Sequence, residues 1–409
     1  MTITVHIPTA LRRFTDGTET LECSAAALGE LLDQLGERFP GLKQHLRDAT
    51  GRVRPFLNIY VNEEDIRFLG GNDYRFQDGD EVMLVPSIAG GAPTAAVSVV
   101  VPATSANLGC AFDCAAFALN RYLKVRATPL EVPGFQVRYR GPNPDRVPED
   151  ETNLVVQAIR RAAVEAGKEM GGASIEIHNE IPVSAGLGAS AAAVIAGLLL
   201  GARLCGVEHD AATVLRLAVE LEGHPDNAAA AYHGGLVLSA IGDNSDQVLT
   251  LKTPVPPDWK IIAVVPELAL PTPQARAVLP ERYSRVDAVH NLQRTALLAA
   301  SFFSGQYHLL PELFRDRFHQ PYRSRLIPGL AGCLELRHPA LLGVFLSGAG
   351  PTVLALVRCS GAAEIAAALS EEFRRHGVQS QVLSLQPENR GAEVLQENRT
   401  SERETRASR

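Results

Sequence analysis

The 409-residue sequence predicts an α+β fold, with a small domain over residues 1–91 followed by a larger two-lobed domain over residues 96–385. Two observations predict this division. Residues 1–91 hold a complete strand, helix, strand, strand pattern that ends in two glycines. The remainder holds three glycine-rich loops, each adjoining an apolar run of strand or helix character. Because 46% of the residues are hydrophobic, a chain of this length can bury more than one core.

The first domain is expected to begin with a strand, since residues 2–7 alternate in polarity as a half-buried strand does. A helix follows, because apolar side chains recur three and four positions apart, at Leu28, Leu31, Leu32, Leu35 and Phe39. Residues 56–61 and 81–86 are β-branched or aliphatic runs and are expected to be strands. The domain closes with Gly90 and Gly91.

This order of elements, with a Gly-Gly end, resembles the β-grasp fold of ubiquitin-like sulfur carriers. The class includes the small subunit of molybdopterin synthase, the thiamine sulfur carrier and, most similar here, the carrier used in cysteine synthesis. The matching residues are 7–12, 61–67 and 89–91. In such carriers an activating enzyme adenylates the terminal carboxylate for conversion to a thiocarboxylate, and a tail without side chains fits its narrow active site.

In this chain Gly91 is joined to Ala92, so that carboxylate is not free as written. Three interpretations stay open. A protease cuts after Gly91 and releases a sulfur carrier. The domain is instead a docking or regulatory module without sulfur chemistry. Or Gly90 and Gly91, with residues 92–95, form a flexible linker.

Residues 181–193 contain the most informative loop of the second domain. Gly186 and Gly188 let a ligand approach the backbone, and Ser190 lies where an Ala/Val/Leu-rich helix begins. A helix N-terminus favours an anion, above all a phosphate, and ATP is the expected ligand. No Lys follows the last glycine, so the loop is not a Walker A motif, and it lacks the third glycine of a dinucleotide-binding fingerprint. A tight turn that packs small residues is the alternative.

Two other segments favour the phosphate interpretation. Residues 101–113 place Ser105, Asn107 and Asp113 in an apolar neighbourhood, which costs free energy unless each finds a partner. Helix capping by the Asn and the Asp is the alternative. Residues 343–355 set a Ser-Gly-Ala-Gly loop between two apolar strand-like runs, as suits a close backbone approach.

In this order the three segments resemble the signature motifs of the GHMP kinase superfamily, and residues 102–109 with Phe112 and Asp113 are similar to those of homoserine kinases. The resemblance covers about residues 95–385 and implies lobes of about 96–255 and 256–385. Two departures stand out. Cys110-Ala111 replaces the usual Pro-Gly, and Ala189 replaces the first of two usual serines.

The resemblance implies an ATP site. Its phosphates would be held by Pro182, Ser184, Gly186, Leu187, Gly188, Ala189, Ser190, Ala191, Ser347 and Gly348, with Asn153 near the adenine. Ser190 and Glu222 would bind Mg²⁺, a hard cation that prefers carboxylate, hydroxyl and phosphate oxygens. Glu220 is the alternative to Glu222, because the sequence leaves the register of this segment open.

The resemblance also implies a site for an amino-acid substrate. Asn107 and Asp113 would hold its amino group and hydroxyl, and whether Asp113 acts as a general base stays open. The carboxylate would pair with arginine, whose guanidinium binds it through two parallel hydrogen bonds. The remaining substrate contacts implied are His224, Asp226, Asn227, Arg276 and Arg323.

The implied activity is ATP-dependent phosphorylation of L-homoserine to O-phospho-L-homoserine, a step toward threonine. One alternative is a sulfur-carrier precursor for sulfur amino-acid synthesis in which the kinase part is secondary. Another is a GHMP kinase acting on a different small hydroxylated metabolite. The expected partners include a sulfur-carrier activating enzyme, a protease acting after Gly91 and a second copy of the chain.

Composition excludes other classes. A net charge of −7 without a basic stripe disfavours nucleic-acid binding. Six cysteines without a Cys-x-x-Cys pair are typical of free thiols in a cytoplasmic protein. We expect no signal peptide, and the longest apolar run, residues 191–204, is too short to span a membrane. Residues 386–409 are polar and charged and are expected to form a disordered tail.

Overall fold

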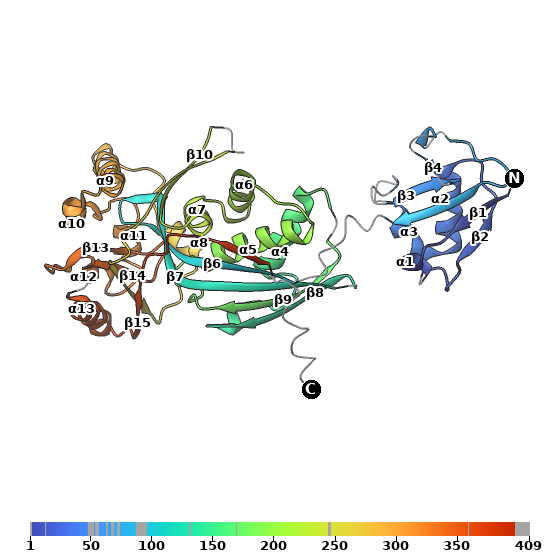
Figure 1. Ribbon diagram of the computed structural model, residues 1–409. Coiled ribbons are helices and arrows are strands. Elements are labelled where there is room, and N and C mark those ends of the chain that lie inside the picture. The colour runs from blue at the N-terminus through green and yellow to red at the C-terminus, as the bar shows by residue number, and fades with distance from the viewer. Residues whose placement is uncertain are drawn as a thin grey trace, which may run out of the picture. The chain divides into compact units, whose positions relative to one another are not determined.

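The computed structural model describes residues 2–12, 14–47, 53, 57–62, 64–66, 69–71, 74–86, 96–130, 132–168, 170–243, 247–358 and 360–396. The chain divides into two compact units, Met1–Ala92 and Pro93–Arg409, each of which is described by itself (Figure 1). The tail glycines Gly90 and Gly91 and the linker expected at 92–95 lie outside the described residues.

The first unit is a five-stranded mixed sheet packed on helices. Its strand order is β2-β1-β5-β3-β4, with β1 and β5 parallel and the other neighbours antiparallel. The strands are β1 (Ile3–His6), β2 (Thr20–Cys23), β3 (Leu57–Val61), β4 (Glu64–Asp65) and β5 (Glu81–Pro86), and the helices are α1 (Thr9–Arg12), α2 (Leu28–Arg38) and α3 (Pro40–Leu46).

The leucine face expected of the helix is buried in α2, where Leu28, Leu31, Leu32 and Leu35 belong to one core with Val5 and other sheet residues. The strands expected at 2–7, 56–61 and 81–86 are present as β1, β3 and β5. This is the β-grasp arrangement. Strand β2 was not expected, since Leu21 is its only buried side chain and four residues give little pattern to recognise.

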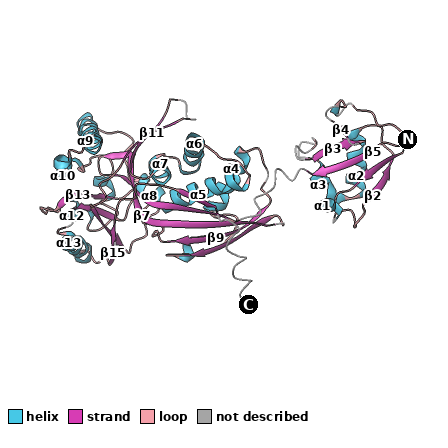
Figure 2. Cartoon of the chain, viewed as in Figure 1, coloured by secondary structure: helices cyan, strands magenta, loops and turns pink. Residues whose placement is uncertain are grey.

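The second unit contains two sheets. The larger has the order β11-β10-β7-β6-β16, with β9 pairing β7 and β8. Its strands are β6 (Val97–Asn107), β7 (Ala111–Leu130), β8 (Gly134–Arg140), β9 (Gly172–Asn179), β10 (Leu236–Ile241), β11 (Val248–Thr253) and β16 (Glu393–Gln396). Helices pack beside this sheet (Figure 2): α4 (Leu154–Glu165), α5 (Ala189–Leu204), α6 (Ala211–Glu222) and α7 (Asp226–His233).

The smaller sheet is antiparallel, in the order β13-β14-β12-β15. Its strands are β12 (Lys260–Pro266), β13 (Leu341–Leu346), β14 (Val353–Val357) and β15 (Ser380–Leu385). The helices of this lobe are α8 (Thr272–Ala277), α9 (Arg285–Ser304), α10 (Leu310–Leu313), α11 (Gln320–Arg323), α12 (Leu330–Leu334) and α13 (Ala362–Arg375). The two sheets with their helices make the two lobes of the kinase-like fold that the sequence predicts.

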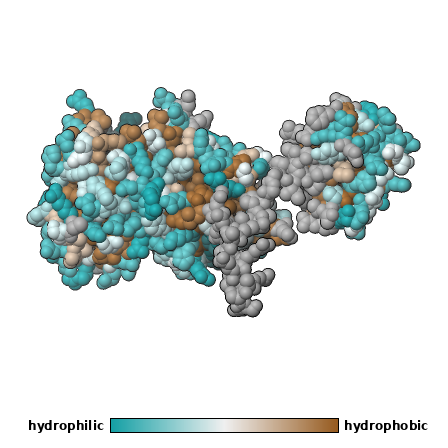
Figure 3. Space-filling view, in the orientation of Figure 1, coloured by the Kyte–Doolittle hydropathy of each residue, from teal (hydrophilic) through white to brown (hydrophobic). Residues whose placement is uncertain are grey.

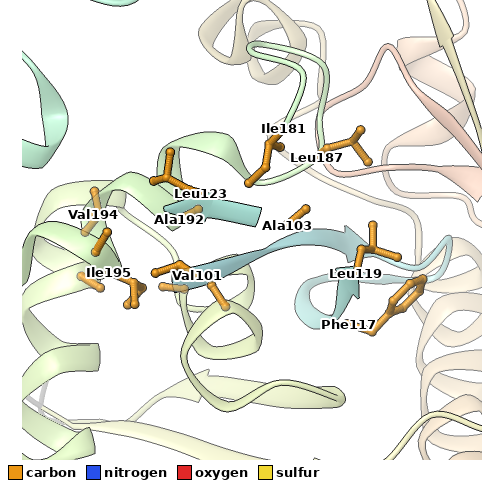
Figure 4. Close-up of a cluster of buried hydrophobic side chains, with 14 of the residues drawn as sticks. Val101, Ala103, Phe117, Leu119, Leu123, Ile181, Leu187, Ala192, Val194 and Ile195 are labelled. Atoms are coloured by element: carbon orange, nitrogen blue, oxygen red, sulfur yellow. The ribbon is translucent and has the colours of Figure 1, made fainter. Parts of the chain in front are cut away.

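Helix α5 is apolar on all sides because it lies inside its lobe rather than on the surface. Its close approach to α4 requires glycine: a Cβ added at Gly197 would lie 2.4 Å from the carbonyl oxygen of Val155, and one at Gly201 would lie 2.5 Å from that of Ile159. Figure 4 shows side chains of β6, β7 and α5 pointing toward one another, with Ile181 and Leu187 of the preceding loop among them. The loop before α5 is therefore anchored in the core.

The expectation of a disordered tail over residues 386–409 is wrong as far as the end of β16. Strand β16 pairs antiparallel with the first residues of β6. Ahead of β16, the Glu388 carboxylate is buried and accepts a hydrogen bond from the Tyr122 hydroxyl. The polar composition was misleading because main-chain hydrogen bonds, which need no apolar side chain, hold this segment.

Hydrophilic residues cover most of the visible surface, with smaller apolar patches between them (Figure 3). Among the described residues, none of the helices combines the length and the apolar composition that crossing a membrane would require.

Candidate functional site

The loop between β9 and α5 has the conformation that its glycines predict. Gly186 and Gly188 have φ angles of 77° and 71°, and Gly188 is the N-cap of α5. A Cβ added at Gly188 would lie 1.9 Å from the Thr104 hydroxyl oxygen, so the loop touches β6 directly. The first main-chain N–H groups of α5 have no partner within the helix and are available to an anion, as a phosphate site needs.

The three glycine-rich segments meet at this loop. Ser347 donates a hydrogen bond of 2.6 Å to the carbonyl of Gly186, and its hydroxyl lies 2.7 Å from that of Ser105. The Asn107 amide donates to the carbonyl of Gly348 at 2.8 Å. Ser105 and Asn107, which looked costly in an apolar setting, thus find their partners in the loop of Ser347 and Gly348.

A cavity of about 470 Å³ opens beside these loops. Most of the predicted site residues line it: Asn107, Asp113, Asn153, Ser184, Gly186, Leu187, Gly188, Ala189, Ser190, Glu222, His224, Asp226, Asn227, Arg276, Arg323 and Gly348. Pro182, Ala191 and Ser347 do not line it. Ser347 instead fixes the loop from behind, as its hydrogen bonds show.

One wall of the cavity pairs a hydroxyl with a carboxylate. The Ser190 hydroxyl donates to Oε2 of Glu222 at 3.0 Å, and burial raises the pKa of Glu222. No ion pair joins Glu222 to a cation in the part of the chain that the structure describes. Glu220, by contrast, forms ion pairs with Arg161 and Arg216 and does not line the cavity.

These oxygens fit a hard divalent cation. A carboxylate that forms no ion pair among the described residues, beside a hydroxyl and a helix N-terminus, offers oxygen ligands, and bound phosphates would have to supply others. The described residues contain no group of three or more His, Cys, Asp or Glu side chains that could hold a metal ion by itself. The chain alone therefore offers a partial ligand set, of the kind that Mg²⁺ uses together with a nucleotide.

A histidine and an aspartate lie next to this wall. His224 Nδ1 is 3.0 Å from Asp226 Oδ1, and this hydrogen bond raises the pKa of His224. Asp226 is only 1% exposed and also accepts from the main-chain N–H of Asn227. The Thr104 hydroxyl donates to Asn227 Oδ1 at 2.8 Å. The segment after α6 is thus tied to β6, and the imidazole faces the cavity.

Asp113 and Arg276 lie against each other in the cavity. The Arg276 guanidinium donates two hydrogen bonds to the Asp113 carboxylate, 3.0 and 2.9 Å long. Asp113 has a positive φ of 51°, and its main-chain N–H donates to Asn107 Oδ1. The sequence did not predict this ion pair, since the two residues were assigned to different groups of a substrate.

Arg323 is the most deeply placed cation of the cavity, with 1% of its surface exposed. Burial, together with the charge of Arg276, lowers the pKa of Arg323 to about 10. Its guanidinium donates to the main-chain carbonyls of Ala275 and Gly348 at 3.1 and 3.0 Å. A buried guanidinium in a ligand cavity is suited to a carboxylate or phosphate, which would offset its desolvation.

The other end of the cavity was missed by the sequence reasoning, apart from Asn153. Its wall is largely apolar and includes Leu123, Tyr139, Val147, Pro148, Ile177 and Asn179. Asn153 caps α4: its side chain accepts from the N–H of Val155 and donates to the carbonyl of Pro148. Leu123, Tyr139, Ile177 and Asn179 come from β7, β8 and β9, and Val147 and Pro148 from the segment ahead of α4. None of these segments carries a recognisable motif, so only the fold brings the residues together.

Two protein families match the second unit. Residues 153–235 match the family described as "GHMP kinases N terminal domain", and residues 296–375 match the one described as "GHMP kinases C terminal". The "ThiS family" description matches residues 5–91.

Curated relatives match the second unit over nearly their own full length. A homoserine kinase of Solibacter usitatus is 40% identical over 294 residues, which cover 72% of this chain and 95% of the relative. One of Desulfitobacterium hafniense is 38% identical over 300 residues, 73% of this chain and 100% of the relative. The crystal structure of a homoserine kinase from Cytophaga hutchinsonii superposes with a TM-score of 0.66 at 29% identity, covering 75% of this chain and 99% of that one.

Proposed function

This chain belongs to the homoserine kinases of the GHMP kinase superfamily, with a ThiS-family domain ahead of its kinase, and we propose that it transfers the γ-phosphate of ATP to the hydroxyl of L-homoserine. One observation carries the proposal: the glycine loop at the N-terminus of α5 and the buried Arg323 line the same cavity. ATP-dependent phosphorylation of an amino acid needs both features in one place.

The cavity divides by chemistry into regions for the two substrates. The apolar end around Tyr139 and Val147 suits the adenine, and the N-terminus of α5 suits the phosphates. Mg²⁺, held by Ser190 and Glu222, would neutralise charge on the β- and γ-phosphates. The end lined by Asp113 and Arg323 suits an amino acid.

L-homoserine would lie with its carboxylate at Arg323, whose guanidinium is already desolvated. Its amino group and hydroxyl would lie near Asn107 and Asp113. Arg276 donates two of its five N–H groups to Asp113, and the other three would be available to the substrate. His224, which also lines the cavity, would help to orient the acceptor.

In this reaction the protein mainly aligns the two substrates and stabilises the transition state. The acceptor hydroxyl must point at the γ-phosphorus, and the charge that spreads over the phosphate oxygens must meet positive dipoles. The N–H groups at the start of α5 are fixed before ATP arrives, so they need no reorganisation during transfer. Asp113, held by Arg276, would orient the hydroxyl and accept its proton late.

The product would be O-phospho-L-homoserine, which leads toward threonine. The ThiS-family match supports a sulfur-carrier-like role for the first unit. In the same proposal, a protease would cut after Gly91 and an activating enzyme would be a partner. The docking-module and linker interpretations remain the alternatives.

A purified kinase tests the first proposal. Phosphate transfer from ATP is measured with L-homoserine and, in parallel, with mevalonate, galactose and shikimate. We expect kcat/KM for homoserine to exceed each of the others by at least about 1,000-fold, since a site built for both a carboxylate and an amino group rejects acceptors that lack one of them. Equal use of mevalonate would contradict the assignment.

The intact mass of the protein from its own cells tests the second. A fragment that begins at Ala92, beside a domain that ends at Gly91, would support a released carrier. A single full-length mass would support a docking or regulatory module.

A further inference from the structure

His319 lies directly behind Arg323 and is completely buried. Its Nε2 is 2.8 Å from the carbonyl oxygen of Gly109, and its Nδ1 is 3.1 Å from Nη1 of Arg323. A carbonyl oxygen only accepts, so the proton of His319 must be on Nε2. Nδ1 then carries a lone pair and accepts the hydrogen bond from Arg323. The two contacts together require a neutral imidazole in one tautomer.

The charged groups around the ring act in both directions: Arg323 lowers the pKa of His319, whereas Asp316 and Asp113 raise it. Arg323 donates at one nitrogen, and Asp316 is 3.6 Å from the other. The Asp316 carboxylate is already satisfied by four N–H donors, those of the Asn291 side chain and of the main chain at Phe318, His319 and Gln320. The Phe112 ring stacks on His319 at 5.2 Å between centroids, and the guanidinium carbons of Arg276 and Arg323 lie 5.7 and 5.5 Å from the Phe112 centroid. Burial lowers the pKa of His319, in agreement with the neutral form.

The guanidinium of Arg323 is thereby fixed on two of its three nitrogens. Nε donates to Ala275, and Nη1 donates to Gly348 and His319. Nη2 has no hydrogen-bond acceptor within the residues that the structure describes, and Arg323 lines the cavity. The two N–H groups of Nη2 are therefore left for a ligand.

We propose that His319 is a positioning residue for substrate binding: it accepts the Nη1 hydrogen bond and so holds Arg323 with Nη2 presented to the carboxylate of the acceptor. The inference rests on the proposed role of Arg323 as the carboxylate partner of L-homoserine. A neutral acceptor suits this position, because a carboxylate there would pair with the guanidinium and weaken its hold on the substrate.

Two substitutions separate positioning from packing. In His319→Asn the side-chain oxygen can take the place of Nδ1 and keep the bond to Arg323. In His319→Gln the side-chain amide N–H can take the place of Nε2–H and keep the bond to Gly109, but Arg323 loses its acceptor. KM for homoserine and for ATP, kcat and the unfolding midpoint are measured for both variants and for Arg323→Lys.

We expect His319→Gln to raise KM for homoserine about tenfold or more with KM for ATP unchanged, because hydrogen bonds to charged groups are worth about that much. His319→Asn should stay within about threefold of the wild type by the same reasoning. An unchanged homoserine KM in His319→Gln, or equal effects in both variants, would overturn the inference.

Arg323→Lys separates this inference from the proposed function. If it leaves KM for homoserine unchanged, the carboxylate role of Arg323 fails and the inference fails with it. If it raises KM while His319→Gln does not, only the inference fails. Should His319→Gln not fold, ¹⁵N NMR of the wild-type imidazole decides: a proton on Nδ1 would overturn the inference, and one on Nε2 alone would support it.

Discussion

Arg276 holds the carboxylate of Asp113 through two nearly equal hydrogen bonds, 3.0 and 2.9 Å long, inside the proposed substrate cavity. The pair joins β7 to α8, so it also joins the two lobes. A carboxylate held at both oxygens has one orientation, which is what a group that aligns a hydroxyl for phosphoryl transfer requires.

We therefore predict that Asp113→Ala lowers kcat/KM for homoserine by at least about 100-fold, because the acceptor hydroxyl loses its alignment and Arg276 loses its anchor. Asp287→Ala is the matched control, since Asp287 pairs with Arg317 outside this cavity. Steady-state kinetics check both variants. A rate for Asp113→Ala close to that of the control would remove Asp113 from the site.

The two glutamates near the end of α6 should differ in their effect on metal dependence. Glu222→Gln should raise the Mg²⁺ concentration for half-maximal rate at least about tenfold, since a carboxylate ligand is lost. Glu220→Gln should leave it unchanged, because Glu220 faces Arg161 and Arg216. Magnesium titration of the rate at saturating ATP measures the difference, and the reverse order would assign the metal to Glu220.

The Glu222 carboxylate should also make the reaction rate fall at acid pH. Burial raises the pKa of Glu222, and only its charged form binds Mg²⁺. Affinity for Mg²⁺ should therefore fall as the pH decreases through that raised pKa. Magnesium titrations at several pH values test this. An affinity that is flat with pH in the wild type, or equally steep in Glu222→Gln, would be inconsistent with the assignment.

Gly188→Ala should impair ATP binding more than it impairs stability. The new Cβ would meet the Thr104 hydroxyl oxygen at 1.9 Å and push the loop away from β6. Gly206→Ala is the control: its φ is 67°, but no atom lies within 4 Å of an added Cβ. Both variants should lose about 1 kcal/mol through backbone strain. Only Gly188→Ala should raise KM for ATP, by about tenfold or more, and similar ATP kinetics in both would refute the close-approach argument.

His224 should contribute stability that depends on pH. The hydrogen bond to Asp226 raises the folded-state pKa of His224 above its ordinary value of 6.5. The contribution is thus full below about pH 6.5 and is lost as the pH rises through the folded-state pKa. Urea unfolding of the wild type and His224→Gln at several pH values should show a stability difference that shrinks with increasing pH. A difference that grows instead would reverse the sign of the coupling.

Sequence motifs predicted the meeting of the three loops because each loop carries glycines or polar residues that are costly in isolation. They favoured Glu222 over Glu220 as the metal ligand but left the register open, since the two residues are two positions apart at a helix end and the exact turn decides. The structure separates them through the arginines around Glu220.

Contacts between segments that are distant in the sequence could not be predicted either. The pairing of Asp113 with Arg276 and the position of His319 depend on how the two lobes pack, which no local pattern records. Strand β7 was missed for a different reason. Its 20 residues mix small, charged and apolar side chains without strict alternation, because parts of both its faces are covered.

The pairing of β16 with β6 has a consequence for the order in which the protein matures. Val100 is among the earliest kinase residues to leave the ribosome, yet its partner Glu393 is synthesised almost at the end of the kinase. All five strands of the β-grasp unit, by contrast, are complete by Pro86. During translation the carrier-like unit is free to fold while most of the kinase is still unmade, and the kinase sheet must wait for its last strand. The two units of one chain would thus fold on two schedules.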